Sequence, residues 1–282
     1  MNILSVQSWV SYGHVGNAAA VFPMQRLGAE VWAINTVQFS NHTGYGVWRG
    51  SVTPPETIRD LVLGIEERGA LPRCDALLSG YLGDPLVAEA VLDARARLAA
   101  ANRHALYCAD PVIGDEDRGV YVRPGIAELM RERIVPASDI LTPNLFELKH
   151  LTGMPCGSLS EVRTAVAALQ ARGPHRVLVT SLRTEETPAD ALDMLAAEGE
   201  AFYRLRMPLL PLAVNGAGDA VAALFLVHCL KTGSAAAALG AAGSAIFGIL
   251  KRTQELGQRE IALIAAQEEL VRPSTVFRPE AV

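Results

Sequence analysis

The sequence predicts an α/β fold built on one doubly wound, three-layered sheet, with a small flap after the second strand. Short apolar segments of strand length alternate with helix-length segments through all 282 residues, a pattern typical of a mostly parallel sheet with helical crossovers. Polar residues follow most of the apolar segments, as expected where strands end at a common edge. No linker-like change in composition and no internal repeat divides the chain. We therefore expect one domain spanning 1–282.

Composition narrows the classes of function. Half of the residues are apolar and the net charge is −5, without a basic stripe interleaved with aromatic side chains, so nucleic acid is not an expected partner. The four cysteines are scattered without metal-ligand spacing and fit reduced thiols in a cytoplasmic protein. The N-terminus lacks the basic start and apolar run of a signal peptide. The apolar stretches around 220–230 and 235–250 are too short or too interrupted to span a bilayer.

The first half of the chain predicts three strands and three helices. The first strand ends at Ser8, and a turn at 13–16 leads into a helix that the Asn17 side chain should cap and Pro23 should kink. The polar, turn-rich segment 38–52 predicts a short hairpin or flap. The expected strands are 3–8, 31–37 and a segment ending at 79–80, and the expected helices are 17–27, 54–68 and 85–102.

The second half continues the alternation. Strands are expected in "HALYCADPVIGD" and in "DILTPNLFEL", the latter ending at Thr142, and Asn144 opens the next helix. Either Ser158 or Ser160 caps a further helix that runs to Arg172. The remaining expected elements are a strand ending at 180–181, a late antiparallel strand in "AFYRLRMPL", two long alanine-rich helices and a final helix at 259–270.

Polar side chains stand at the carboxyl ends of these strands. Taken alone, each fits the chemistry of a turn or a helix cap. In an open α/β sheet, however, ligands bind beyond the carboxyl ends of the strands, so their shared placement predicts a site there. The residues concerned are Ser8, the segment 41–45, Tyr81, Asp110 with Asp115, the segment 142–147, and Thr180 with Ser181.

The segment "VNGAGDAVAALFL", residues 214–226, predicts a buried helix behind a bare glycine turn. Gly216 and Gly218 should delay the helix until about Asp219. The uncovered N–H groups of the turn form an anion site at the positive end of the helix. A carboxylate beside an anion is favourable if it faces the hydroxyl that attacks a transferring phosphoryl group. The alternative is that Asp219 caps an ordinary helix behind a glycine turn.

Other phosphate motifs are absent from the chain. No GxxxxGK[ST] sequence occurs, and no GxGxxG follows the first strand. P-loop kinases and ordinary dinucleotide-binding enzymes are therefore disfavoured. A methyltransferase or dehydrogenase on a doubly wound sheet remains only an alternative at the level of the fold.

Several segments resemble a known family. "NGAGDAVAALF" resembles the GxGD signature of the ribokinase-like kinases, and "TPNLFEL" resembles their TPNxxE segment. "VQSWVSYGHVGNAAAVFPMQRLGAEV", "NTVQFSNHTGYGVWRGSV", "LLSGYLGD" and "CADPVIGD" are similar to segments of pyridoxal kinases, in the same order from residue 3 to about 273. The resemblance implies a ribokinase-like fold and ATP- and Mg²⁺-dependent phosphorylation of the 5′-hydroxymethyl group of pyridoxal in vitamin B6 salvage, with pyridoxamine and pyridoxine as further candidate substrates. It also implies a homodimer, in which the flap is a candidate interface; the cytoplasmic location rests on the cysteines.

The resemblance assigns roles to positions of this sequence. The residues implied to contact the B6 vitamer are Ser8, Thr43, Gly44, Tyr81 and Asp219. Asp219 is implied to be the catalytic base, and Gly216, Ala217 and Gly218 the anion hole. The positions expected on the nucleotide side are Asp110, Asp115, Tyr121, Thr142, Asn144, Glu147, Thr180, Ser181, Met207, Pro208, Leu209 and Leu210. Asp110 and Glu147 are also the expected magnesium ligands, since Mg²⁺ prefers carboxylates and water.

Some positions depart from the bacterial pattern and leave the preferred vitamer open. Trp9 stands where most bacterial relatives have histidine, Val120 where several have cysteine, and Thr180 where they have lysine. Gly44 replaces a common glutamine, and Asn215 is typical of ribokinase-like neighbours. A hydroxymethylpyrimidine or sugar kinase of the same fold is therefore an alternative. A non-catalytic B6-binding protein is another, although such a protein has no use for an intact base and anion turn.

Overall fold

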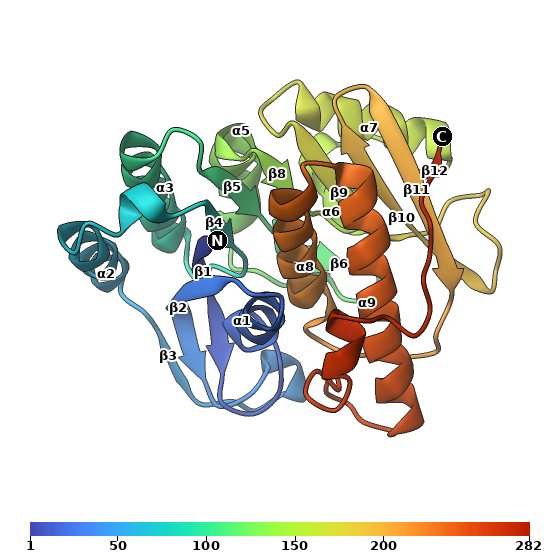
Figure 1. The fold of residues 1–282 in the computed structure, drawn as a ribbon, viewed down its shortest axis with the longest axis horizontal. Coiled ribbons are helices and arrows are strands. Elements are labelled where there is room, and N and C mark those ends of the chain that lie inside the picture. The colour runs from blue at the N-terminus through green and yellow to red at the C-terminus, as the bar shows by residue number, and fades with distance from the viewer.

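A ten-stranded sheet forms the centre of the computed structural model, which describes residues 1–282 (Figure 1). The strands of the sheet are β1 (Asn2–Val10), β2 (Glu30–Phe39), β3 (Gly50–Val52), β4 (Ala76–Ser79), β5 (Leu106–Ala109), β8 (Ile140–Leu141), β9 (Arg176–Leu182), β10 (Ala191–Glu198), β11 (Ala201–Pro208) and β12 (Glu280–Ala281). Their spatial order is β12-β11-β10-β9-β8-β5-β4-β1-β2-β3. The six strands from β2 to β9 pair in parallel, so their carboxyl ends share one edge. Beside that edge, β6 (Gly114–Asp115) and β7 (Gly119–Val120) form a separate small hairpin.

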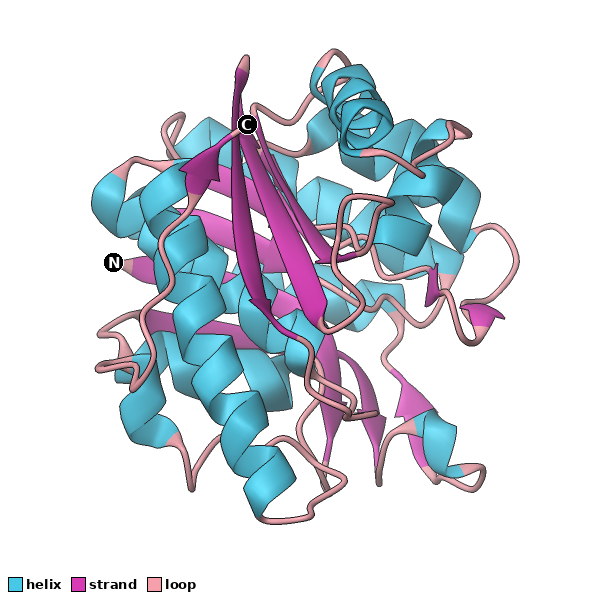
Figure 2. Cartoon of the chain, turned by 90° about the vertical axis from the view of Figure 1, so that its right-hand side faces the viewer, coloured by secondary structure: helices cyan, strands magenta, loops and turns pink.

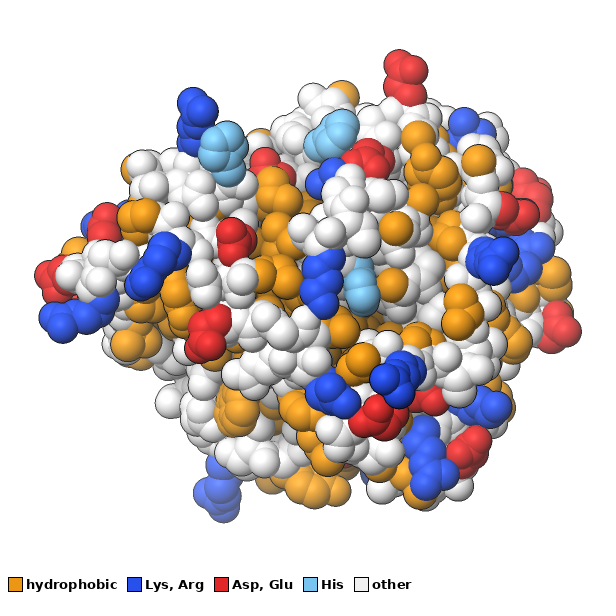
Figure 3. Space-filling view, in the orientation of Figure 1, with side chains coloured by type: hydrophobic (Ala, Val, Ile, Leu, Met, Phe, Trp, Pro, Cys, Tyr) orange, Lys and Arg blue, Asp and Glu red, His pale blue; other side chains and the backbone are white.

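Helices cover both faces of the sheet, as Figure 2 shows from the side. They are α1 (Asn17–Arg26), α2 (Pro55–Glu67), α3 (Pro85–Ala101), α4 (Ile126–Leu129), α5 (Val135–Ala137), α6 (Leu145–Thr152), α7 (Leu159–Gln170), α8 (Ala217–Thr232) and α9 (Ala235–Glu255). Buried residues of α2 to α7 form one large core, and those of α1, α8 and α9 form the other on the opposite face. The expected three-layered, doubly wound architecture is therefore confirmed. On the face shown in Figure 3, acidic and basic side chains are interspersed rather than gathered by sign.

Most expected elements are present, and several local details are confirmed. The flap is a hairpin arm in which β3 pairs antiparallel with β2. Asn144 and Ser158 each accept a hydrogen bond from the third residue of the helix that follows, so each completes a capping box. The strand at Ala201–Pro208 is antiparallel, as expected. Short-range chemistry therefore predicted these elements correctly.

The expected cap of α1 is wrong. Gly16 is the N-cap, with a φ of 55°. Asn17 instead lies inside the first turn, where its buried side chain accepts a hydrogen bond from Ser5 Oγ at 2.7 Å and donates one to the Ile34 carbonyl at 3.0 Å. A buried amide must find partners, and here those partners lie on β1 and β2 rather than on the helix.

The prediction of a helix at 259–270 is also wrong. This segment is irregular until a short 3-10 helix at Gln267–Leu270. Ile261, Ala262 and Leu263 are all buried. This continuous burial does not by itself exclude a helix, because α8 is buried in the same way; a local contact decides the conformation instead. The Thr253 hydroxyl accepts the Ala262 N–H at 2.9 Å and holds the irregular turn against the end of α9.

Two further differences are a strand that was not expected and the start of a helix. The strand β10 was not expected, because "ALDMLAAE" is alanine-rich and lacks the alternation of a half-buried strand. In the sheet, β10 pairs antiparallel with both of its neighbours, β9 and β11. The helix α8 begins at Ala217, two residues before the expected start at Asp219, because only Gly216 leaves the helical conformation.

The helix α9 is long enough and apolar enough, by length and composition alone, to cross a membrane, contrary to the expectation from its interruptions. In the structure 61% of its apolar window is buried inside the protein. It packs against α8, β10 and β11, and Gly243 lies against the Leu205 side chain of β11. This is the placement of a core helix.

Candidate active site

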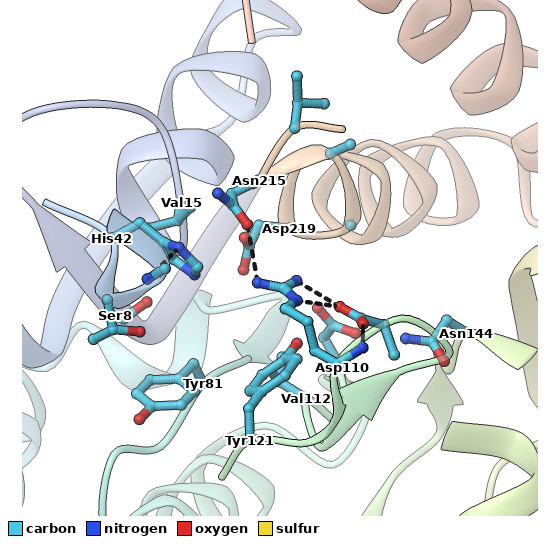
Figure 4. A pocket seen from close by; sticks show the side chains of 18 of the residues that line it. Ser8, Val15, His42, Tyr81, Asp110, Val112, Tyr121, Asn144, Asn215 and Asp219 are labelled. Carbon is cyan, nitrogen blue, oxygen red and sulfur yellow. Dashed lines mark hydrogen bonds and ion pairs between the residues drawn. The ribbon is translucent and has the colours of Figure 1, made fainter. Parts of the chain in front are cut away.

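A cavity of about 410 Å³ lies at the carboxyl edge of the parallel strands. The sequence-predicted residues that line it are Ser8, Thr43, Gly44, Tyr81, Asp110, Asp115, Tyr121, Thr142, Asn144, Glu147, Thr180, Ser181, Gly216, Ala217, Gly218 and Asp219. Met207, Pro208, Leu209 and Leu210, at the end of β11, do not line it. Figure 4 shows Ser8, His42 and Tyr81 at one end of the cavity, Asn144 at the other, and Asp110 and Asp219 between them.

The end of the cavity near Ser8 is an apolar slot with a few polar groups. Val10, Val37 and Phe39 line it and pack against one another in a small separate core. Ser8 is only 6% exposed, and its hydroxyl makes no hydrogen bond within the protein. Tyr81 is held in place because the Thr36 hydroxyl donates to its carbonyl at 2.7 Å. Apolar walls with a few free polar groups are typical of a site for a small flat ligand.

These apolar residues were missed by the sequence reading. Val10 lies on β1 beyond Ser8, where the strand was expected to have ended, and Val37 and Phe39 alternate along β2. The alternation at the end of β2 was a usable signal. Trp9 and Val120, two of the departures from the bacterial pattern, do not line the cavity, whereas Gly44, Thr180 and Asn215 do.

Three carboxyl groups gather at the centre of the cavity. Burial, and then the nearby Glu147 and Asp219, raise the pKa of Asp110 well above its ordinary value. Burial also raises the pKa of Asp219, although the N–H of Gly16 opposes this. Asp110 accepts a hydrogen bond from the Thr142 hydroxyl at 3.2 Å, which leaves its other oxygen free. Carboxylates that repel one another in a buried site favour a bound cation.

Glu147 is committed to local structure. Its Oε1 accepts the Ile113 N–H at 2.9 Å, and its Oε2 accepts the Asn144 N–H at 2.9 Å within the capping box of α6. Burial raises the pKa of Glu147 to about 7, while these backbone N–H groups oppose the shift. Asn144 is similarly engaged, because its amide donates to the Gly114 carbonyl at 2.8 Å. Both side chains therefore shape the loop that follows Asp110.

The donor set fits magnesium in one specific way. No group of three or more acidic, histidine or cysteine side chains converges as a metal cage. Mg²⁺ is usually bound by one or two carboxylates together with water and substrate phosphates. Asp110 offers a free, buried carboxylate oxygen for this, and Glu147 lies beside it with both oxygens already accepting backbone N–H groups.

The turn before α8 is shaped by a close contact. Gly216 has a φ of 83°, and a Cβ there would collide with the carbonyl of His14. Gly218 has ordinary backbone angles and open space around it. Gly216 is therefore required by the fold, whereas Gly218 leaves the first turn of the helix uncovered. Asp219 follows in the same turn and faces the middle of the cavity (Figure 4).

The hairpin β6–β7 covers one side of the cavity and brings an unexpected cation. Arg118 pairs with Asp115 at 2.5 and 2.7 Å, and its guanidinium lies 4.9 Å from the ring centre of Tyr121. Burial alone would raise the pKa of Asp115, but Arg118 lowers it. His42 and Asn215 also line the cavity. His42 lies in the segment 41–45 that was predicted to reach the site, and Asn215 directly precedes the predicted glycine turn, but neither was assigned a role. Arg118 alone belongs to no motif that marked a site.

Comparisons with known proteins agree with this geometry. A family model described as phosphomethylpyrimidine kinase matches residues 45–263. Pyridoxal kinase PdxY of Granulibacter bethesdensis is 59% identical over 98% of both chains, and the protein of that name from Rubrobacter xylanophilus is 52% identical over 98% of this chain and 96% of its own.

Solved structures give the same match. Pyridoxal kinase from Leishmania donovani in complex with ADP and pyridoxamine superposes with a TM-score of 0.92 at 28% identity, covering 100% of this chain and 99% of the other. Pyridoxal kinase from Trypanosoma brucei superposes with a TM-score of 0.88 at 27% identity and the same coverage.

Proposed function

The chain belongs to the pyridoxal kinase family of ribokinase-like phosphotransferases, and on that premise we propose that it transfers the γ-phosphoryl group of ATP to the 5′-hydroxymethyl group of pyridoxal. The observation that carries this proposal is the placement of Asp219 and the bare turn of α8 between two different ends of one cavity. The product of this reaction is pyridoxal 5′-phosphate, as B6 salvage requires.

The end near Ser8 suits the vitamer. Its valine and phenylalanine walls can contact the faces of a pyridine ring, and the free hydroxyl of Ser8 can bond a ring substituent or the ring nitrogen. Tyr81 offers an aromatic surface beside them. Thr43 and Gly44 lie on the exposed flap over the same end. This arrangement supports a vitamer held with its hydroxymethyl group toward Asp219.

The other end suits the nucleotide. Thr180 and Ser181 lie there at the end of β9, and Ser181 has a φ of 51°, which is uncommon for a residue with a side chain. The backbone of Thr180 is tied to the Pro143 carbonyl at 2.9 Å, close to the start of α6. Thr142 and Asn144 complete this end.

The chemistry follows from these positions. The hydroxyl oxygen of the vitamer forms a bond to the γ-phosphorus, and the bond from that phosphorus to its bridging oxygen breaks, with the electron pair leaving on ADP. Asp219 takes the hydroxyl proton. The N–H groups of the turn at 216–218 donate to the oxygens of the transferring group. Asp219 needs little basicity, because a loose transition state demands little early deprotonation.

A divalent cation completes the proposal. Asp110 would hold Mg²⁺ through its free carboxylate oxygen, and Glu147 would add a second carboxylate beside it. When bound, Mg²⁺ offsets charge between the phosphates of ATP. The homodimer, the cytoplasmic location and the single domain expected from the sequence remain predictions.

The experiment is an ADP-release assay with pyridoxal, pyridoxamine, pyridoxine and hydroxymethylpyrimidine side by side. We expect the highest kcat/KM with a B6 vitamer and a kcat lower by about 10²-fold or more in Asp219→Asn. A preference for hydroxymethylpyrimidine would favour a hydroxymethylpyrimidine kinase as the second candidate function. The matching family model, described as phosphomethylpyrimidine kinase, supports that candidate. Binding of pyridoxal without any ADP release would instead indicate a non-catalytic binding protein.

A further inference from the structure

Arg118 is the one lysine or arginine among the residues that line the cavity. Four carboxylates line the same cavity, those of Asp110, Asp115, Glu147 and Asp219. The polyphosphate of a nucleotide would add further negative charge to this site. One divalent cation does not balance the negative charge of these carboxylates and the polyphosphate together. A positively charged side chain near the phosphates would therefore stabilise the bound nucleotide.

The guanidinium of Arg118 is held in a defined position. Its Nε and Nη2 bond Asp115, and its Nη1 donates to Asn215 Oδ1 at 3.4 Å, the dashed line at Asn215 in Figure 4. The face of the group lies over Tyr121. These three bonds leave N–H donors on Nη1 and Nη2 unused. The side chain is 47% exposed, so the unused donors remain open to a ligand.

Asn215 fixes where those donors lie. It immediately precedes Gly216, whose turn begins the anion site of α8. The Arg118 guanidinium therefore stands beside the place proposed for the transferring phosphoryl group. It comes from the hairpin on the opposite side of the cavity from α8, so a phosphate between them has donors on two sides.

We propose that Arg118 binds the terminal phosphates of the nucleotide and supplies the positive charge that Thr180 and Ser181 cannot. This proposal rests on the proposed function and deepens it. As the bond between the γ-phosphorus and the bridging oxygen breaks, negative charge develops on that oxygen, which departs as part of ADP. An arginine at that position stabilises this charge, and its planar fork can bond two phosphate oxygens at once.

The competing explanation is structural. Arg118 joins Asp115 on the hairpin to Asn215 beside α8, so it could serve only to fasten the hairpin across the cavity. The two roles differ in what they require of the ligand. A phosphate contact acts on ATP and not on AMP, which lacks the β- and γ-phosphates, whereas a fastened hairpin affects both nucleotides alike.

The test is calorimetric binding of ATP and of AMP, in Mg²⁺ buffer, to the parent, Arg118→Gln, Arg118→Lys and Arg123→Gln. Arg123 is the matched control, because it is the next arginine along the chain and pairs with Asp84 at 3.0 Å outside the cavity. We expect Arg118→Gln to weaken ATP binding about tenfold to a hundredfold, with AMP binding unchanged. Arg118→Lys should restore part of the loss, and Arg123→Gln should match the parent.

Two results would overturn the proposal. One is an Arg118→Gln protein that binds ATP as tightly as the parent, and the other is an equal loss of ATP and AMP affinity. Thermal melting of each variant shows that it is folded. A parent that binds ATP but does not phosphorylate pyridoxal would count against the proposed function alone, because the binding comparison still decides the role of Arg118.

Discussion

The backbone of Gly216 lies so close to the carbonyl of His14 that no side chain fits between them. This contact joins the turn before α8 to the turn that precedes α1. It fixes the uncovered N–H groups of α8 relative to the first strand, which carries Ser8. The anion turn and the vitamer end of the cavity are thus parts of one rigid arrangement.

Gly216 and Gly218 should therefore fail differently when substituted. Gly216→Ala introduces a collision and an unfavourable φ, which should lower Tm by about 5 °C or more. Gly218→Val has room and ordinary backbone angles, so the fold should survive. Its branched side chain lies over the N–H groups and should lower kcat/KM for ATP about tenfold. Melting curves and steady-state kinetics on both variants test this difference. If Gly218→Val had the kinetics of the parent, the N–H groups of the turn would not bind the transferring phosphoryl group.

Ser8→Ala and Thr43→Ala should weaken vitamer binding more than ATP binding. Ser8 offers a buried hydroxyl without a partner in the protein, so its loss should raise KM for pyridoxal about fivefold. Both residues lie at the opposite end of the cavity from Asn144 (Figure 4, for Ser8). The measurement is KM for each substrate with the other saturating. If either change raised KM for ATP alone, the division of the cavity would be wrong.

His42 should make the flap sensitive to acid. Burial, and then the charge of Arg118, lower the pKa of His42, while Glu260 raises it. The folded state thus binds fewer protons than the unfolded state below about pH 6.5. The stability linked to His42 is present above that pH and is lost as the pH falls below it.

Protonation would also remove the bond in which His42 Nδ1 accepts the Gly44 N–H. Asparagine can accept the same N–H without titrating, so His42→Asn should lose less Tm than the parent between pH 7 and pH 5.5. Equal pH dependence of Tm in the two proteins would contradict this assignment. Arg118→Gln should raise the pKa of His42, which NMR titration of the ring can follow.

Chelation should abolish turnover. Glu147 and Asp219 both raise the pKa of Asp110 at the centre of the cavity, and Arg118 alone cannot balance these groups together with a polyphosphate. We expect activity to disappear when EDTA removes divalent cations and to return when Mg²⁺ is added back. The control is the Tm of the chelated protein, which should change little. Sustained turnover in metal-free buffer would show that the carboxylates have another purpose.

The sequence predicted the parts of the site that depend on neighbouring residues. Polar residues at strand ends, the capping box at Asn144 and Glu147, and the glycine turn before Asp219 are all local features. Their convergence in one cavity follows from parallel strands ending at one edge. Pattern and turn chemistry were sufficient for these residues.

The missed residues depend on contacts distant in sequence. Arg118 and Asn215 are 97 residues apart and meet only through the fold. An arginine in a polar loop is usually a solvated surface charge, so the sequence gives no reason to place it over the cavity. Asn17 was misread for a similar reason, because its partners belong to β1 and β2.

Asp219 is the proposed base, and kcat of Asp219→Asn decides whether it has this role. Asparagine keeps the size of the side chain and its place in the first turn of α8 but cannot take the hydroxyl proton. We expect a fall in kcat of about 10²-fold or more, with vitamer affinity within about threefold of the parent and an unchanged Tm, because ground-state contacts survive. If a folded Asp219→Asn protein retained the kcat of the parent, Asp219 would not be the base and would be only the cap of a helix.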